Sequence, residues 1–146
     1  MTQLSKYFAL SELTVSESAA RRGLKNVPFG KQLENLKQTA QRMDAIREGL
    51  GKPIIVTSGY RSPEVNAAIG GSRTSAHCHG LAVDFTCPGY GSPLAVAKAI
   101  LASGIEFDQL IHEFGAWVHI GFAEPGKPSR RQTLTINKRG TLAGLQ

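Results

Sequence analysis

An amphipathic segment over residues 29–50 most strongly constrains how this chain of 146 residues can fold. Charged and amide side chains fill one of its faces, and Gly49, Gly51 and Pro53 end it. Its apolar side chains recur at spacings of three and four residues, as they do along one face of an α-helix: Phe29, Leu33, Leu36, Ala40, Met43, Ile46 and Leu50. We therefore predict a long helix with a single apolar stripe.

Two later runs of residues predict strands. Residues 54–57 are rich in β-branched side chains, which favour a buried strand. Residues 81–86 alternate between bulky apolar and smaller or polar side chains, as half-buried strands do. In that alternation Asp84 lies on the face opposite Val83 and Phe85. We therefore expect its carboxylate to point away from the core and toward a site.

A hairpin is predicted further along the chain. The extended runs 107–113 and 117–122 enclose Phe114-Gly115-Ala116, a three-residue connection with a central glycine. Residues 133–136 are a last strand candidate, and residues 137–140 are typical of a turn. We therefore expect three or four strands, joined mainly by hairpin connections.

Serine residues mark the starts of several shorter helices. Ser11 and Ser16 occupy positions typical of N-caps, and the second would begin a short helix over 16–22. Further helices are predicted over 63–69 and from Ser92 to Ser103, each with a proline in its first turn. The chain shows no internal repeat or linker. Together these elements predict one α+β domain over all 146 residues, with a small, mainly antiparallel sheet flanked by helices.

The histidines suggest a metal site. His77, Asp84 and His119 offer two imidazoles and one carboxylate, a set that can bind zinc and leave a fourth position open, as catalytic zinc sites do. His79 could add a ligand, but a supporting or solvent-facing histidine is the simpler interpretation. A thiolate ligand from Cys78 is less favoured, because soft sulfur ligands are typical of closed structural sites. We expect both cysteines to be free thiols.

Ordered motifs around these residues resemble one known family. The motifs are Ser75-x-His77-x-x-Gly80-x-Ala82-x-Asp84 and Trp117-x-His119, preceded by a Thr-Ser-Gly-Tyr-Arg-Ser-Pro run that starts at Thr57. They are similar to the M15 family of zinc peptidases, which includes D-alanyl-D-alanine carboxypeptidases, peptidoglycan endopeptidases and phage endolysins. The resemblance covers about residues 4–122 and implies the fold of the D-Ala-D-Ala carboxypeptidase and Hedgehog-type zinc peptidases.

The resemblance also implies roles for individual residues. Zn²⁺ would be held by His77, Asp84 and His119. Arg61 would bind the substrate carbonyl or the developing oxyanion, a task that suits a permanently charged guanidinium. Ser75 would contact substrate or support the first histidine. Trp117 would form a wall of the substrate cleft or part of the core, and it too is a candidate substrate-binding residue.

At the position of the general base this chain departs from the family pattern. Many family members carry an acid three residues before the last histidine, where this chain has Ala116. The nearest carboxylate is Glu113, at the other end of the hairpin loop, and relatives that read Glu-Phe-Gly-x-Trp-Val-His support it as the catalytic base. Alternatively, Ala116 replaces a lost acid, and the domain is a catalytically impaired, zinc-stabilised module that binds peptidoglycan.

Charge and the chain start suggest where such an enzyme would act. The net charge is +6, and the segment after residue 122 is a basic tail that could contact an anionic cell envelope. A solvated basic edge is an equally simple interpretation, and no motif supports specific nucleic-acid binding. We expect neither a membrane span nor a signal peptide. The chain would then be a monomeric phage or prophage lysis enzyme, made in the cytoplasm and released onto the cell wall.

Overall fold

Helix α3 (Lys31–Leu50) buries the predicted apolar stripe in the computed structural model, which describes residues 2–146. Leu36, Ala40 and Met43 are fully buried, and Gly51 ends the helix in the left-handed conformation. The prediction was wrong for Phe29, which precedes the helix and is 75% exposed. The chain turns at Gly30, whose φ of 59° is open mainly to glycine, so the stripe begins later than its spacing suggests.

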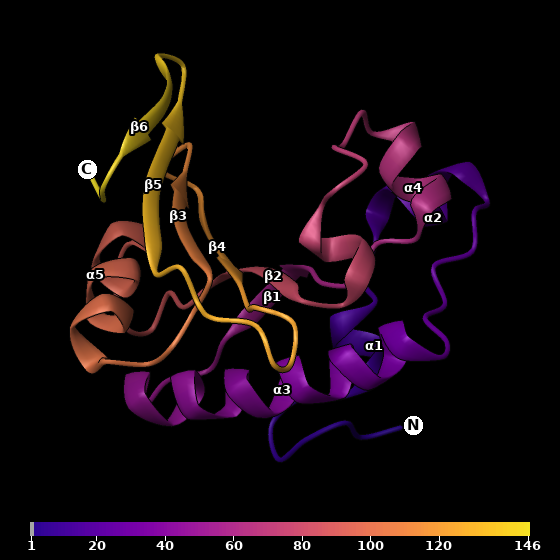
Figure 1. The fold of residues 1–146 in the computed structure, drawn as a ribbon, viewed down its shortest axis with the longest axis horizontal. Coiled ribbons are helices and arrows are strands. Elements are labelled where there is room, and N and C mark those ends of the chain that lie inside the picture. The colour runs from indigo at the N-terminus through magenta and orange to yellow at the C-terminus, as the bar shows by residue number, and fades with distance from the viewer. Residues whose placement is uncertain (1) are drawn as a thin grey trace.

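A six-stranded sheet forms the second layer of the part of the chain that the structure describes (Figure 1). Four of its neighbouring pairs are antiparallel and one, β3 with β5, is parallel, which confirms the predicted α+β domain with a mainly antiparallel sheet. In spatial order the strands are β1 (Ile55–Ser58), β2 (Ala82–Thr86), β4 (Trp117–Gly121), β3 (Gln109–Glu113), β5 (Gln132–Asn137) and β6 (Gly140–Ala143).

Most of the predicted turns and caps form as expected. The β3–β4 hairpin closes through residues 114–116, with Phe114 and Gly115 both at positive φ. The predicted caps Ser16 and Ser92 bond to the N-termini of α2 (Glu17–Arg22) and α5 (Pro93–Ser103). Ser62, which was not predicted as a cap, does the same for α4 (Pro63–Ala68).

Two local predictions need correction. Ser11 is not an N-cap, because it lies inside α1 (Leu10–Leu13), and Ala9 precedes that helix. The side chain of Glu12 accepts a hydrogen bond from Ala9 N, so an acid in the first turn satisfies the backbone N–H of the residue that precedes the helix. No helix was predicted between residue 69 and the strand at 81–86, yet His77 lies in a short 3₁₀ turn, η1 (Ala76–His79).

The segment expected to be a basic tail is built into the sheet. Strand β5 pairs in parallel with β3, and β6 folds back on β5 through the predicted turn near Asn137. Strand β6 was not predicted, because its sequence Gly-Thr-Leu-Ala has little apolar alternation. Because β6 is an exposed strand at the edge of the sheet, it can form without a strong alternation of apolar side chains.

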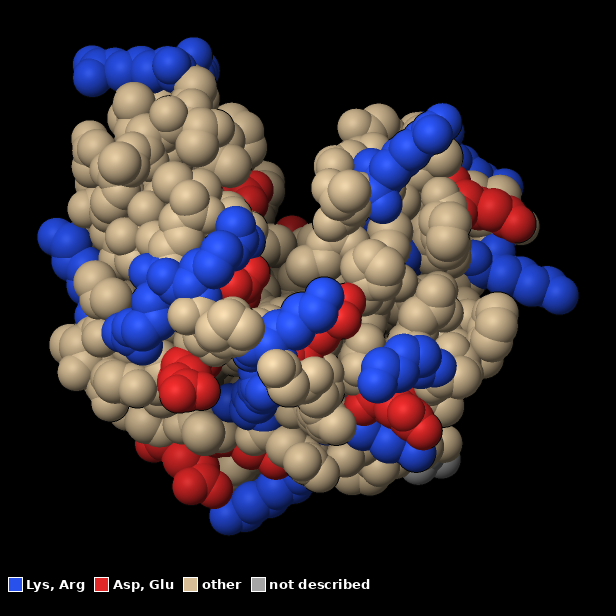
Figure 2. Space-filling model, viewed as in Figure 1, with Lys and Arg blue, Asp and Glu red and all other residues tan. Residues whose placement is uncertain are grey.

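The two faces of the sheet have different neighbours. Helices α3 and α5 pack with Val83, Phe85 and Val118 in the core on one face. Because side chains alternate along a strand, Asp84 and His119 point to the other face. That face borders a hollow between the strands and the region of α4, which the space-filling view in Figure 2 shows; Figure 1 labels these elements from the same side. No helix within residues 2–146 is long and apolar enough to cross a membrane.

Candidate metal centre

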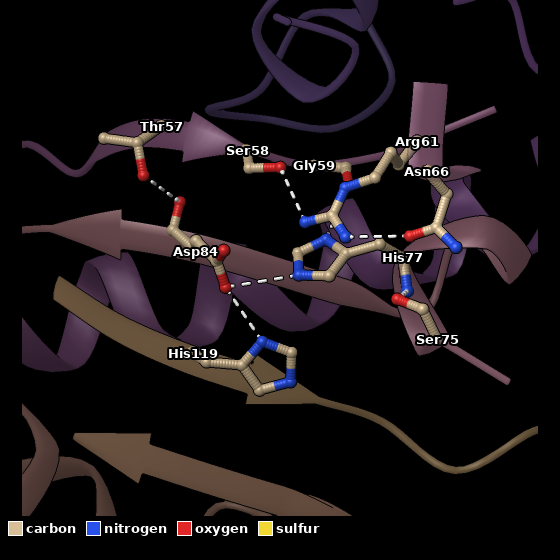
Figure 3. A network of polar contacts seen from close by, with 9 residues as sticks. All are labelled: Thr57, Ser58, Gly59, Arg61, Asn66, Ser75, His77, Asp84 and His119. Atoms are coloured by element: carbon tan, nitrogen blue, oxygen red, sulfur yellow. Dashed lines mark hydrogen bonds and ion pairs between the residues drawn. The ribbon is translucent and has the colours of Figure 1, made fainter. Parts of the chain in front are cut away.

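The register of the sheet brings two of the three candidate ligands together. Asp84 on β2 lies directly opposite His119 on β4, and His119 Nδ1 is 2.8 Å from Asp84 Oδ1. The turn η1 places His77 above the same carboxylate, with His77 Nε2 3.2 Å from Asp84 Oδ1 (Figure 3). One ligand atom from each of these residues lies within 4.8 Å of the others, so the group could hold a metal ion.

The tautomer of His77 suits metal binding. Its Nδ1 lies 2.8 Å from the carbonyl oxygen of Gly59, which can only accept a hydrogen bond, so Nδ1 carries the proton. The lone pair of Nε2 is then directed at the carboxylate of Asp84. Metal-binding histidines are commonly oriented in this way by a carbonyl behind them.

His77 Nε2 and Asp84 Oδ1 are both electron-rich, so a positive charge between them would stabilise their close approach. Burial, the largest influence, lowers the pKa of His77, which disfavours a second proton on its ring. Burial by itself would raise the pKa of Asp84, but contacts with His119 and His77 outweigh it and hold that pKa far below the usual range. An ionised Asp84 facing a neutral His77 is the arrangement that a divalent cation stabilises, so the residues present fit zinc.

The alternative ligands do not join this cluster. His79 is exposed, and its carbonyl accepts a hydrogen bond from Asn35. Cys78 and Cys87 are free buried thiols, as predicted, and neither belongs to the metal-ligand group found within residues 2–146. His112 lies on the other face of β3, where its Nδ1 contacts the carbonyl oxygen of Gln146.

Arg61 faces the centre from the side opposite the sheet. Its guanidinium donates to Asn66 Oδ1 at 3.1 Å and to Ser58 Oγ at 3.5 Å (Figure 3). Its backbone N–H donates to the carbonyl oxygen of His77 at 3.1 Å, which joins Arg61 to the turn that carries this histidine. Such a position fits the predicted role in binding a substrate carbonyl or oxyanion, which stays a prediction.

Glu113 lies at the end of β3, opposite Trp117. Because Ile111 is paired with His119 and Glu113 lies two residues further along β3, the Glu113 side chain shares the cleft face with that histidine. Burial raises the pKa of Glu113 first, and the negative charge of Asp84 raises it further. A carboxylate with a raised pKa is suited to accept a proton near neutral pH. Ala116 is exposed in the hairpin loop, and its N–H donates to the carbonyl oxygen of Glu113.

A family comparison agrees with this geometry. A family model described as Peptidase M15 matches residues 6–121 of the chain. The chain belongs to the M15 peptidase family. M15 peptidases are zinc enzymes, so the His-Asp-His group is the expected metal site of a metallopeptidase that acts on peptide substrates. A comparison with curated proteins gave no match.

Ser75 has a structural contact in this M15 peptidase. Its Oγ accepts a hydrogen bond from His77 N at 3.3 Å and so caps the turn that carries the first ligand. The residue also lines a pocket of about 390 Å³ together with His119. Its predicted contact with substrate is therefore compatible with its position.

Trp117 belongs to the cleft face of the M15 domain, because it shares that face of β4 with His119. Its ring packs against Phe114, with 5.6 Å between the ring centroids. Its Nε1 is buried without a hydrogen-bond partner among residues 2–146, and Glu113 lies directly opposite Trp117 on β3. The buried indole N–H is thus available to orient the carboxyl.

Two residues that position Arg61 were not assigned this task from the sequence. Asn66 accepts from Arg61 and donates to the carbonyl oxygen of Ser72 at 2.8 Å. A Cβ at Gly71 would collide with the side-chain oxygen of Asn66, so a larger residue there would displace the Asn66 side chain. The contact between Asn66 and Arg61 depends on side-chain placement that no spacing in the sequence reveals.

Proposed function

We propose that this M15 peptidase hydrolyses peptide bonds in the stem peptides of bacterial peptidoglycan, with zinc as its metal. The supporting observation is the His77–Asp84–His119 group, with Glu113 on the same face of the sheet as His119 and Arg61 bonded to the backbone of His77, in a chain that matches the M15 family model. The bond cut is either D-Ala-D-Ala or an internal bond of the L-Ala-D-Glu type.

The chemistry divides among the residues as follows. Zinc bound in such a site polarises a carbonyl and makes water acidic. Glu113 accepts the proton of the attacking water and returns it to the leaving amine. Arg61 donates to the carbonyl oxygen as negative charge develops on it, while Asn66 holds the guanidinium in place. Trp117 keeps water from one side of the Glu113 carboxyl.

The proposed setting is a phage or prophage lysis enzyme that reaches the wall after the membrane opens. The net charge of +6 supports attraction to an anionic envelope. Exposed lysines and arginines are spread over the face drawn in Figure 2, which suits nonspecific electrostatic contact.

Digestion of purified peptidoglycan tests the proposal. The zinc-loaded protein should release soluble fragments whose masses identify the bond cut, and Arg61→Ala should slow release by about 10²–10³-fold, as loss of an oxyanion donor does. Absence of new amino groups with zinc fully bound would rule out hydrolysis of this substrate.

A second candidate function is supported by Ala116. If Glu113 does not replace the acid missing at that position, the domain would bind peptidoglycan through the same cleft without cutting it. Sedimentation with insoluble peptidoglycan, together with zero release of amino groups, would identify this case.

A further inference from the structure

The cleft continues past His119 into a pocket of about 390 Å³ whose far wall contains an ion pair. Hydroxyl side chains line the near side: Ser72, Thr74 and Ser75. Arg130 and Asp108 form the far side, and Gly121 lies between them and His119. Arg130 lies outside residues 6–121, the part matched by the family model.

Asp108 holds the guanidinium of Arg130 through two parallel hydrogen bonds. Arg130 Nε donates to Oδ1 at 3.0 Å, and Nη2 donates to Oδ2 at 2.7 Å. The backbone N–H of Arg130 donates to Oδ1 as well, at 3.1 Å. A bidentate pair of this kind fixes the plane of the guanidinium as well as its position.

Neighbouring contacts hold the backbone on both sides of this pair. Arg131 N donates to the carbonyl oxygen of Phe107, and Gln132 N donates to that of Asp108. The Arg131 guanidinium lies over the Phe107 ring, 4.6 Å from its centroid, and binds the carbonyl oxygen of Ile105. Arg130 is therefore presented to the pocket from a fixed backbone.

The Arg130 guanidinium keeps donors for a second partner. Of its five N–H groups, Asp108 uses two, and Nη1 has no partner among residues 2–146. The side chain is 59% exposed, so these donors face solvent in the pocket. Because Asp108 balances the charge of Arg130, recognition at this edge depends on directed hydrogen bonds more than on net charge. A planar carboxylate matches such a fork.

The spacing along β3 sets the distance of this site from the metal centre. His119 is paired with Ile111, and Asp108 lies three residues before Ile111, which corresponds to about 10 Å along a strand. An extended peptide covers the same distance in two to three residues. A Cβ at Gly121 would lie 3.6 Å from His119 Nε2, so glycine keeps the floor between the two sites open.

We propose that Arg130, oriented by Asp108, binds a substrate carboxylate located two or three residues from the hydrolysed bond. This inference rests on the proposed function and names its substrate class, an acidic peptide that extends beyond the cut. It favours an internal bond over a terminal D-Ala-D-Ala bond, because the terminal carboxylate next to that cut lies too close to reach Arg130.

The test uses soluble stem peptides in which each carboxylate in turn is converted to a primary amide. At one of these positions, amidation should raise the KM of the native enzyme about 10-fold and change kcat little. An effect of this size is expected because amidation removes one charge-assisted hydrogen-bonded pair. Arg130→Gln should raise KM for the free acid by a similar factor and leave KM for that amide unchanged. Lys98→Gln on α5, which packs on the opposite face of the sheet, removes the same charge and should change neither value.

The outcomes separate this inference from the proposed function. If the peptides are cleaved but the effect of amidation on KM is the same in the native enzyme and in Arg130→Gln at every position, the carboxylate site is overturned. The proposed peptidase function is then left intact. The opposite case is binding without cleavage, and calorimetry of the same peptides with the zinc-loaded Glu113→Gln variant covers it. If this variant binds the free acid more tightly than the amide, and if that preference depends on Arg130, the carboxylate site is supported without hydrolysis. Peptides that neither bind nor react overturn both.

Discussion

The two walls of the cleft are built by different means. On the sheet wall, Asp84, His119 and Glu113 occupy neighbouring strands and are aligned by backbone register. On the opposite wall, Arg61 and His77 lie in the connection between β1 and β2, His77 within the short turn η1, and single hydrogen bonds to a side chain and a carbonyl hold them. The first wall depends on the many repeated bonds of the sheet, and the second on a few single contacts.

This difference predicts unequal tolerance to substitution. A side chain on the sheet wall can change size without moving its neighbours, because the strand backbone does not depend on it. On the other wall, close backbone approaches leave no such freedom, as at Gly59, where a Cβ would collide with the carbonyl of Leu13. The same Gly59 supplies the carbonyl that orients His77.

The largest effect is expected where the two walls meet at the metal. His77→Ala and His119→Ala each remove one ligand, one from each wall, and both should reduce activity more than the loss of a general base does. Elemental analysis should find zinc lost from both variants, and chelation should lower the Tm of the native protein, because a metal bound only by the folded state stabilises it. Full zinc occupancy in either variant would contradict the ligand assignment.

The next largest effect is expected at the end of the sheet wall. Glu113→Gln should reduce kcat by about 10²–10⁴-fold, as removal of a general base does, with zinc still bound. Alanine at the same position should do so as well. Retention of full activity would exclude Glu113 as base and leave the metal site unaffected.

The Glu113→Gln variant should also change how the stability of the protein depends on pH. Burial raises the pKa of Glu113 in the folded protein, so the protonated form is favoured by folding. The associated stability is present below the unfolded pKa and is lost as pH rises through the folded pKa. In metal-free protein, Glu113→Gln should therefore match the native chain near pH 4 and exceed its Tm at neutral pH. Parallel thermal melts at several pH values measure the difference.

A smaller effect is expected from the support of Arg61. Gly71→Ala displaces the Asn66 side chain and should cost about 1–3 kcal/mol of unfolding free energy, with reduced activity because the guanidinium loses its anchor. Gly49→Ala in α3 is the control: no atom lies within 4 Å of the added Cβ, so stability should stay equal or rise by up to about 1 kcal/mol. Urea unfolding and peptidase assays distinguish the two.

The smallest effect tests the tolerance of the sheet wall. Ile111→Val beside His119 should cost about 0.5–1.5 kcal/mol of unfolding free energy through lost packing, while kcat/KM stays within about twofold. A loss of activity as large as that of Gly71→Ala would show that register alone does not hold the histidine, and the contrast between the walls would fail.

Local chemistry made much of this protein predictable. Serine caps, glycine stops and alternating side chains act within a few residues, so α2, α5 and the β3–β4 hairpin could be placed from the sequence, and the face of Asp84 followed from strand alternation. The ligand set and the predicted base came from ordered motifs that resemble the M15 family, to which the chain belongs.

Tertiary structure decided the features that depend on residues far apart in the chain. The parallel pairing of β5 with β3 brings Arg130 to Asp108, a contact across 22 positions that no local pattern encodes. The anchoring of Arg61 likewise needs the space left by Gly71 once α4 has packed. Sequence periodicity reports which face of an element is apolar, whereas the partner of a polar side chain depends on which backbones approach it after the core has formed.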